Sequence, residues 1–372
     1  MEVKYRRLES VKRVSEIQAK SYADLRQAQQ QGKKVAFAAG NPTLHLPLRA
    51  MDIAFRYGDS FAATASAKHK QEPLMTASME RGLPLESCCY GKNILGAFWM
   101  PEEQRAGEPI YEPFKPDFVA GIDSGCSVGM GWMMATRRWF KVPAYFMVQP
   151  YLWKKDDEKE AVQELTEQFR GYISFIEEMT QAPFNWERHR QMLANLKEAI
   201  TLRVNTQDLA GRAIPSPTTT WDWGSALGVV NYGAGTPLCT DVYRQINEEV
   251  KTRIKNHQGA VEPERCRLYL MGFVPWPNLG ELARMLAELG ANVVAAFYTH
   301  NCFIDHPDKI DLEKPLESLA ANSLFPLGWN IEPLTELILQ TCRDYSIDGL
   351  VCSHLHTCYP ASNFYFEIAE AV

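Results

Sequence analysis

The stretch Arg-Leu-Tyr-Leu-Met-Gly-Phe at residues 267–273 is a short, mostly apolar run of the kind found inside parallel β-sheets. A helical pattern follows it at residues 278–289, and a second apolar run lies at residues 292–297. The order of helix and then strand recurs at residues 331–345 and 349–352. Strands that alternate with helices predict a doubly wound α/β unit with parallel strands.

A second unit of this kind is predicted in the N-terminal half. Short apolar runs at residues 34–39, 117–122 and 142–148 are expected to be strands of another parallel sheet. Between the two units, residues 156–206 are highly charged and have apolar residues at helical spacing. We therefore expect an α/β protein with two doubly wound, Rossmann-like parallel-sheet domains and a helical middle section.

The expected domains are an N-terminal helix at residues 1–32, a first α/β domain at 33–155, a helical section with a tryptophan-bearing loop at 156–260, and a second α/β domain at 261–372. The loop is assigned to residues 211–237, which are rich in Pro, Thr, Gly and Trp. Such a loop either closes over a functional crevice or only connects two domains. In the first case Trp221 and Trp223 would offer flat apolar faces to a substrate. No strand follows the helix expected at residues 363–372, so the second domain is expected to be incomplete at its C-terminal end.

The composition narrows the class of protein. The formal charge of −6 leaves no excess of Lys and Arg to neutralise the phosphates of a nucleic acid. No apolar run is long enough to span a membrane, and residues 1–20 do not resemble a signal peptide. We therefore expect a soluble, cytoplasmic protein.

Nine cysteines, an odd number, do not suggest a disulfide framework in such a protein. Cys126, Cys302 and Cys358 follow predicted strands, and Cys88 and Cys89 lie in a polar loop. Loops at the carboxyl ends of parallel strands are where ligands bind in open sheets. Several thiols at such positions would suit an iron–sulfur cluster or a zinc ion, because thiolates are ligands for both.

The spacing of these cysteines forms no metal-binding motif, so another chemistry stays open. Cys358 with His354 or His356 would be the nucleophile and base of a Cys/His enzyme. The remaining thiols Cys239, Cys266 and Cys342 lie inside helical or strand patterns and are expected to be packing residues.

Several motifs resemble the 2-hydroxyacyl-CoA dehydratase and benzoyl-CoA reductase family. Residues 88–93 (Cys-Cys-Tyr-Gly-Lys-Asn) resemble its cysteine, small, aromatic and basic signature. Residues 124–126, before an aromatic-rich helix, resemble its second cysteine site, and residues 348–358 resemble the third. Residues 37–41 and 272–278 look closest to the B-type subunit of ATP-dependent benzoyl-CoA reductases. The likeness covers nearly the whole chain and keeps the order of the motifs.

This resemblance implies that Cys88, Cys126 and Cys358 hold a [4Fe–4S] cluster, with one iron left without a cysteine ligand. The family offers no counterpart for three other thiols near the expected crevice, Cys89, Cys302 and Cys352. Their roles, and the fourth ligand of the cluster, are therefore left open.

The resemblance also implies two partners, a second subunit of the same family and an ATP-hydrolysing iron–sulfur activator protein. The chain itself has no Gly-x-x-x-x-Gly-Lys-Ser/Thr loop with which to bind ATP. The expected reaction is the dearomatising reduction of an aromatic acyl-CoA by single-electron transfer. Such a reaction needs proton donors, and His300, His354 and His356 lie in the candidate loops.

Other functions remain open on the sequence. A radical 2-hydroxyacyl-CoA dehydratase subunit would recycle its electron while water leaves the substrate, and a related reductase would hold an atypical cluster. A non-catalytic scaffold would only bind the acyl-CoA or the catalytic partner. Iron content separates the scaffold from the enzymes, and the electrons consumed per product separate a reductase from a dehydratase.

Overall fold

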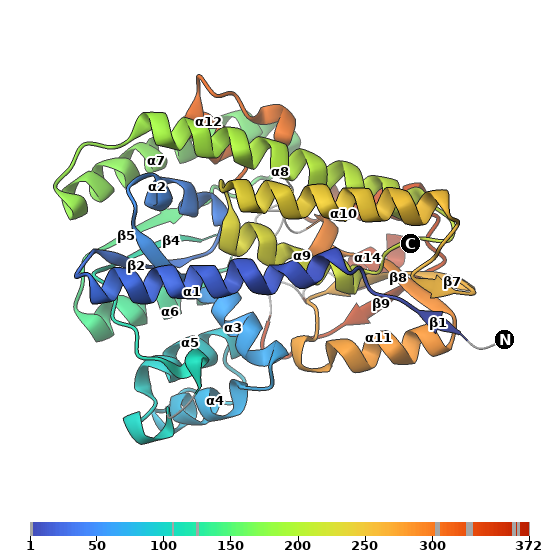
Figure 1. The fold of residues 1–372 in the computed structure, drawn as a ribbon, viewed down its shortest axis with the longest axis horizontal. Coiled ribbons are helices and arrows are strands. Elements are labelled where there is room, and N and C mark those ends of the chain that lie inside the picture. Colours follow the sequence, from blue (N-terminus) through green and yellow to red (C-terminus); the bar gives the residue numbers. More distant parts are fainter. Residues whose placement is uncertain are drawn as a thin grey trace.

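The computed structural model describes residues 3–105, 108–123, 126–301, 306–324, 330–358, 362 and 365–371. Two parallel sheets lie toward opposite ends of its longest axis, with helices around and between them (Figure 1). The predicted α/β class with two parallel sheets and a helical middle section is therefore confirmed. Within these residue ranges, no helix combines the length and the apolar character needed to cross a membrane.

The first sheet has the strand order β3-β2-β4-β5, and all its neighbouring strands are parallel. Its strands are β2 (Val35–Ala39), β3 (Ala54–Tyr57), β4 (Phe118–Asp123) and β5 (Ala144–Val148). The helices in this part of the chain are α2 (His45–Ala50), α3 (Gly58–Ala67), α4 (Gln71–Glu80), α5 (Cys89–Trp99) and α6 (Ser127–Phe140). Alternate residues of β2 enter two different hydrophobic cores, one on each face of the sheet, which explains why the strand is apolar throughout. The three strands predicted here are confirmed, whereas β3 was not predicted.

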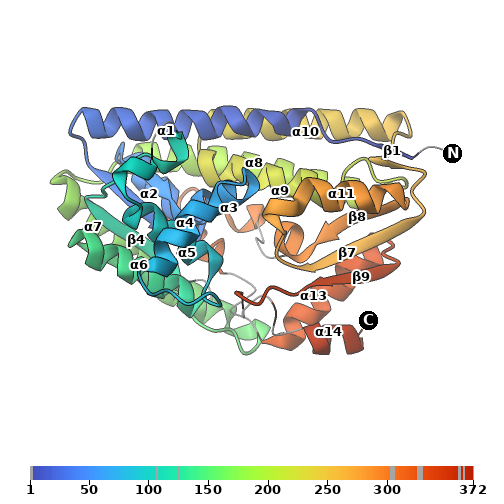
Figure 2. The ribbon, with the colours of Figure 1, turned by 90° about the horizontal axis from the view of Figure 1, so that it is seen from below.

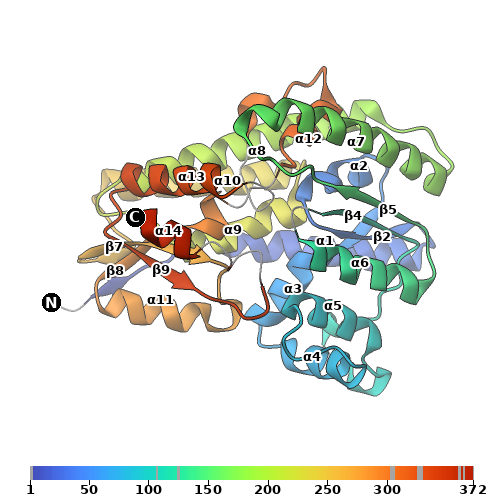
Figure 3. The same ribbon diagram turned by 180° about the vertical axis from the view of Figure 1, so that it is seen from behind.

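The second sheet has the order β8-β7-β9 and is also parallel. Its strands are β7 (Cys266–Gly272), β8 (Ala291–Ala296) and β9 (Gly349–Ser353), and its helices are α11 (Leu279–Glu288), α13 (Ile331–Asp344) and α14 (Tyr365–Ala371). Helix α12 (Pro315–Ala321), which follows β8 in the chain, packs instead into the large core that also contains Ala36 of β2. A core of its own packs between this sheet and its helices. Seen from behind, α13 and α14 lie on the same side of this sheet (Figure 3). The predicted alternation of strand and helix is therefore confirmed in this half.

Long helices connect the two sheets. They are α1 (Val14–Gln30), α7 (Glu158–Thr180), α8 (Trp186–Arg212), α9 (Thr220–Gly233) and α10 (Pro237–Lys255). Helices α1 and α10 lie together along one side of the molecule (Figure 2). The prediction of one helix over residues 1–32 is wrong at its start, because β1 (Lys4–Tyr5) pairs antiparallel with β6 (Val261–Glu262) and the α-helix begins only at Val14.

The prediction of a long loop at residues 211–237 is also wrong. Most of this segment is helix α9, whose first turn is capped by reciprocal hydrogen bonds between Thr219 and Asp222. Asp222 is fully buried and also accepts hydrogen bonds from the Arg7 side chain and the Leu8 backbone. The segment after β1 therefore fixes the start of α9, and the helix packs between the two sheets.

Arg267, in the first half of β7, joins the second sheet to the end of α8. Its guanidinium is buried, forms an ion pair with Glu264, and donates hydrogen bonds to the carbonyl oxygens of Gly211, Ala213 and Tyr345. A buried ion pair is costly to break because the remaining charge has no partner. Arg267 is therefore expected to matter more for stability than the exposed arginines.

Replacing Arg267 with methionine should lower the free energy of unfolding by about 3–5 kcal/mol, because it leaves the Glu264 carboxylate buried without its cation. Arg212→Met is the matched control, since Arg212 is half exposed and pairs with two exposed or partly exposed aspartates. That control should cost no more than about 1 kcal/mol. Chemical denaturation measures both, and equal losses would contradict the role given to Arg267.

The strand order of both sheets indicates where a ligand would bind. Strand β2 lies between β3 and β4, and β7 lies between β8 and β9, so the chain passes first to one side of the initial strand and then to the other. Ligands of open α/β sheets bind outside the carboxyl ends of the strands at such a switch point. The residues that follow β2, β4, β7 and β9 are therefore the first place to look for a site.

Candidate active site

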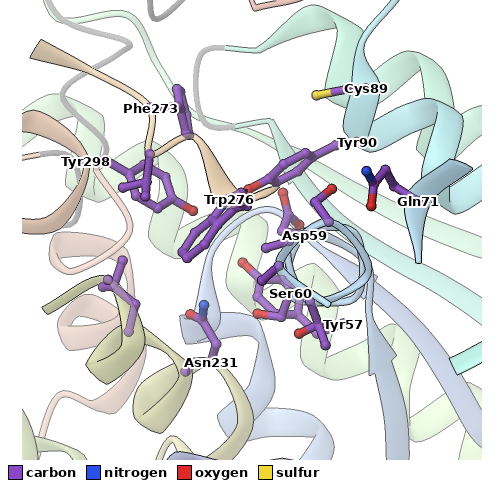
Figure 4. A pocket seen from close by; sticks show the side chains of 18 of the residues that line it. Tyr57, Asp59, Ser60, Gln71, Cys89, Tyr90, Asn231, Phe273, Trp276 and Tyr298 are labelled. Atoms are coloured by element: carbon purple, nitrogen blue, oxygen red, sulfur yellow. The ribbon is translucent and has the colours of Figure 1, made fainter. Parts of the chain in front are cut away.

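A cavity of about 650 Å³ lies where the carboxyl ends of the two sheets face each other. Segments that follow six strands contribute to its wall, together with one face each of α3 and α9. The lining residues after the strands include Gly40, Asp59, Cys126, Trp276, Tyr298 and Cys358. Figure 4 shows part of this wall from close by. Both switch points therefore open into one space.

Gly40 allows the ends of β2 and β4 to approach closely at the first switch point. It has a φ of +99°, and a Cβ atom there would lie 2.2 Å from the carbonyl oxygen of Ile122. Its N–H group donates a hydrogen bond of 3.0 Å to Oδ2 of Asp59, and its carbonyl oxygen accepts one from the Tyr57 hydroxyl. The carboxyl group of Asp59 is thereby held at the cavity wall.

Asp59 is the acidic residue of this site, and sequence reasoning missed it. Burial raises the pKa of its carboxyl group to about 6, although the hydrogen bond from Gly40 opposes the rise. A carboxyl group with this pKa can hold a proton close to neutral pH and release it. The position directly after a strand was the available signal, but β3 has only four residues and contains Arg56, so it was not recognised.

Four thiols line the same cavity: Cys88, Cys89, Cys126 and Cys358. Cys88 and Cys126 each stand immediately before a helix, α5 and α6. Burial, together with the nearby Cys89 and Cys126, raises the pKa of the Cys88 thiol to about 12. Burial also raises the pKa of the Cys126 thiol. The predicted ligands Cys88, Cys126 and Cys358 are therefore brought to one cavity, and Cys89 joins them.

Backbone N–H groups at the helix starts point to two of these sulfurs. Those of Tyr90 and Gly91 lower the pKa of Cys88, and those of Val128 and Gly129 lower the pKa of Cys126. Such donors stabilise a thiolate. Lys92 stabilises the loop before Cys88. Its ammonium group is buried and donates a hydrogen bond to the carbonyl oxygen of Leu85 in that loop.

The donor set fits a thiolate-bound cluster in its chemistry: sulfur ligands from three separate segments, N–H donors at two of them, and a mostly apolar surrounding. In the part of the chain that the structure describes, no three His, Cys, Asp or Glu side chains lie close enough together to hold a metal ion. The convergence of Cys88, Cys126 and Cys358 to ligand distance therefore stays a prediction.

An aromatic wall lines another part of this cavity. It consists of Tyr90, at the start of α5, and Phe273, Trp276 and Tyr298 from the second sheet (Figure 4). Nε1 of Trp276 donates a 2.7 Å hydrogen bond to the Tyr90 hydroxyl. The rings of Phe273 and Tyr298 lie 4.5 Å apart between centroids. No local pattern in the sequence indicated this wall, because its members come from separate strand-to-helix connections and one helix start.

Trp221 and Trp223, the predicted substrate-binding residues, lie elsewhere. Both are almost fully buried, Trp221 in the core of the second sheet and Trp223 in the large core shared with the long helices. The cavity is instead lined by residues further along α9, which include Gly224, Leu227 and Asn231. The two tryptophans therefore hold α9 in place and do not reach the cavity.

The three histidines named as proton donors are not on the cavity wall either. His300 is partly buried and does not line the cavity; its Nδ1 is hydrogen-bonded to Thr299, and desolvation lowers its pKa to about 3. His354 and His356 do not line the cavity, whereas Leu355 and Thr357 between and after them do. This segment forms a turn, closed by a 3.0 Å hydrogen bond from the Cys358 N–H group to the Leu355 carbonyl oxygen.

The remaining cysteines fall into three groups. Cys239 is buried in the core, as predicted, and Cys266 and Cys342 are half-buried. Cys352 is exposed in β9 and does not line the cavity. Cys302 lies outside the described residues.

Buried histidines should make the fold sensitive to acid. His189 is fully buried between Phe184 and Trp186, and burial lowers its pKa to about 4. Because this value lies below that of an unfolded histidine, the unfolded chain binds more protons at low pH. The stability that neutral His189 contributes is complete above about pH 6.5 and is lost as the pH falls toward 4.

Replacing His189 with leucine should therefore reduce the loss of stability between pH 6.5 and 4, by up to about 3 kcal/mol. His257→Asn is the control, since His257 is exposed and asparagine tolerates its positive φ. Denaturation at a series of pH values measures the effect. Identical pH slopes for wild type and His189→Leu would contradict the prediction.

Comparison with known proteins gives a consistent set of relatives. A family model described as "2-hydroxyglutaryl-CoA dehydratase, D-component" matches residues 47–372. The B subunit of benzoyl-CoA reductase from Thauera aromatica is 24% identical over 368 residues, which cover 94% of this chain and 82% of that protein. The alpha subunit of (R)-2-hydroxyisocaproyl-CoA dehydratase from Clostridioides difficile is 20% identical over 288 residues, or 77% of this chain and 69% of that protein. The alpha subunit of lactoyl-CoA dehydratase from Anaerotignum propionicum is 21% identical over 369 residues, or 95% and 86%. All three are named as subunits of enzymes that act on CoA thioesters.

Proposed function

We infer the function from the family of this chain, which belongs to the 2-hydroxyglutaryl-CoA dehydratase D-component family. We propose that it is the iron–sulfur subunit of a benzoyl-CoA reductase-type enzyme, which dearomatises an aromatic acyl-CoA by single-electron transfer. The observation that carries this proposal is the shared cavity, which has four thiols, a buried carboxyl group and an aromatic wall. A [4Fe–4S] cluster and a flat apolar acyl group would both find their partners there.

Cys88, Cys126 and Cys358 are proposed to hold the cluster, with Cys89 beside them. A bound cluster would supply single electrons at low potential. The N–H donors at the starts of α5 and α6 would stabilise two of the ligating thiolates. The protein's part in the reaction is to hold the acyl group, exclude water and move protons.

We assign proton transfer to Asp59, and binding of the acyl group to the aromatic wall. Dearomatisation adds protons as well as electrons to the ring, and the Asp59 carboxyl group faces the cavity with a pKa of about 6. We assign to it the donation of a proton to the substrate. The flat faces of Phe273, Trp276 and Tyr298 suit an aromatic or other apolar acyl group and keep water from it.

Partners are part of the proposal. The relatives are named as alpha or B subunits, so we propose a second subunit of the same family for this chain. Since the sequence has no Gly-x-x-x-x-Gly-Lys-Ser/Thr loop, we assign ATP hydrolysis to a separate iron–sulfur activator protein. Exposed aromatic side chains at Tyr151 and Trp153 are compatible with such association.

A second function, in which the chain is a subunit of a radical 2-hydroxyacyl-CoA dehydratase, is favoured by the names of two of these relatives. The two reactions differ in electron demand. The test is anaerobic purification, analysis of iron, sulfide and EPR signals, and then counting of electrons consumed per product. Two electrons per product would support the reductase, and catalytic amounts of electrons would support the dehydratase. A protein that binds no iron would contradict both.

A further inference from the structure

One face of helix α3 lines the cavity along its whole length. Asp59, Ser60, Ala63, Thr64, Ala67 and Lys68 all contribute to the wall, at the spacing of residues that share one side of a helix. The charge of Asp59 acts on Cys126, so the start of α3 lies near the thiols. With a rise of about 1.5 Å per residue, the stripe extends roughly 14 Å from Asp59 to Lys68. The cavity is therefore a channel that leads away from the thiols.

The far end of this channel is open and basic. Among its lining residues Ala67, Lys68 and Lys12 are exposed to solvent, whereas those near Asp59 are buried or half-buried. Lys12 forms an ion pair of 2.5 Å with Glu9. No ion pair is seen for Lys68 within the described ranges of the chain. A cation at the mouth would attract an anionic group that stays outside while the rest of a ligand enters.

Two polar atoms inside the channel have no partner among the described residues. They are Oγ of Ser60, whose side chain is 5% exposed, and the amide oxygen Oε1 of Gln71. Figure 4 shows both side chains at the cavity, with the amide of Gln71 turned toward it. A buried polar group without a hydrogen bond costs about 1–3 kcal/mol. A ligand that supplies N–H and C=O groups at this depth would remove that cost.

The rest of the channel wall is apolar. Val14 from α1, Met75 from α4 and Leu227 from α9 lie around the stripe of α3, where Ala63 leaves room. A ligand that matches the channel, taken from the mouth to the thiols, has anionic groups at the mouth, amides and aliphatic carbons in the middle, and its reacting group at the thiol end. The pantetheine arm of coenzyme A, with its phosphates, has this order.

We propose that the α3 channel is the binding site for the pantetheine arm of a CoA thioester. Ser60 and Gln71 pair with its amides, and Lys68 contacts the phosphates at the mouth. The acyl group then lies at the inner end, between the thiols and the aromatic wall. This inference rests on the proposed function and adds the direction in which the substrate enters.

The test compares coenzyme A with pantetheine, which has the same arm without the nucleotide phosphates, by calorimetric titration of the full chain purified anaerobically. Lys68→Glu should weaken coenzyme A binding about three- to tenfold and leave pantetheine binding within about twofold. Gln71→Leu and Ser60→Ala should weaken both ligands by about three- to tenfold. Lys115→Glu is the control for Lys68→Glu, because Lys115 is exposed and does not line the cavity.

The outcomes separate this inference from the proposed function. If wild type binds coenzyme A and all three channel variants bind it equally well, the arm lies elsewhere and the inference is overturned, while the proposed function stands. If wild type binds neither coenzyme A nor its thioesters, both fall. Thermal unfolding of each variant, with Lys115→Glu as the reference, shows whether a loss of binding is only a loss of folding.

Discussion

Replacing Cys126 with alanine should remove most of the iron from the anaerobically purified protein. Cys126 lies at the end of β4, at the switch point of the first sheet, and its thiol lines the cavity with Cys88 and Cys358. A cluster held by only three cysteines depends on each of them. Cys88→Ala and Cys358→Ala should have the same effect. Iron and sulfide analysis, with EPR of the reduced protein, measures the loss.

Two controls make this test specific. Cys342→Ala changes a half-buried thiol of α13 that does not line the cavity, and Cys239→Ala changes a fully buried thiol of α10. Both should keep wild-type iron, although Cys239→Ala is expected to cost some stability. Full iron in Cys126→Ala would point to a different ligand set, with Cys89 as the first candidate to replace it.

Apart from β3, the strands of both sheets were predictable because their signal is local. A run such as residues 35–39 is apolar throughout, and helices on both faces of the sheet require this. The same holds for residues 293–297, and the alternation of such runs with helices indicated the doubly wound arrangement. Hydrophobic periodicity therefore decided the fold class.

Helix α9 was missed because its burial removes the usual signal. It passes between the two sheets and is buried on nearly every side. Its sequence therefore lacks the polar face that marks a helix at the protein surface. Its three glycines, at 224, 228 and 233, also have low helix propensity. At Gly228 a Cβ atom would lie 2.6 Å from Val14 of α1, so close helix packing explains one glycine that the sequence alone suggested was part of a loop.

The site was predictable only in part. Cysteines in strand-to-helix connections, and their resemblance to a family pattern, identified three residues that do line one cavity. The carboxyl group and the aromatic wall were not predicted, because they meet only when two sheets face each other. Asp59 and Trp276 are more than 200 residues apart, and no short-range pattern connects them.

Replacing Asp59 with asparagine should reduce turnover by about two to four orders of magnitude, the usual contribution of a positioned proton donor. Asparagine has nearly the same shape, and its amide oxygen can still accept the hydrogen bond from Gly40. The cluster ligands are unchanged, so iron content should stay at the wild-type level. The expected change is therefore in the chemical step, with the fold and cofactor intact.

The dependence on pH gives this prediction a second measurement. Burial raises the pKa of Asp59 to about 6, so the protonated donor is abundant below pH 6 and is lost as the pH rises. Wild-type turnover should fall through this range if proton donation limits the rate, and Asp59→Asn should show no such step. A variant that keeps wild-type turnover and the same pH profile would exclude Asp59 as the donor.

Stability distinguishes this role from a structural one. Since the pKa of Asp59 is higher in the folded chain than in the unfolded chain, ionisation of Asp59 lowers the stability of the fold as the pH rises from about 4 to 6. Asp59→Asn removes this cost and should be no less stable than wild type at pH 7. Asp59→Glu, which keeps the acid but moves it, should recover part of the lost turnover. A stable, iron-loaded and inactive Asp59→Asn protein, with partial activity in Asp59→Glu, is the result that only a proton-donating carboxyl group explains.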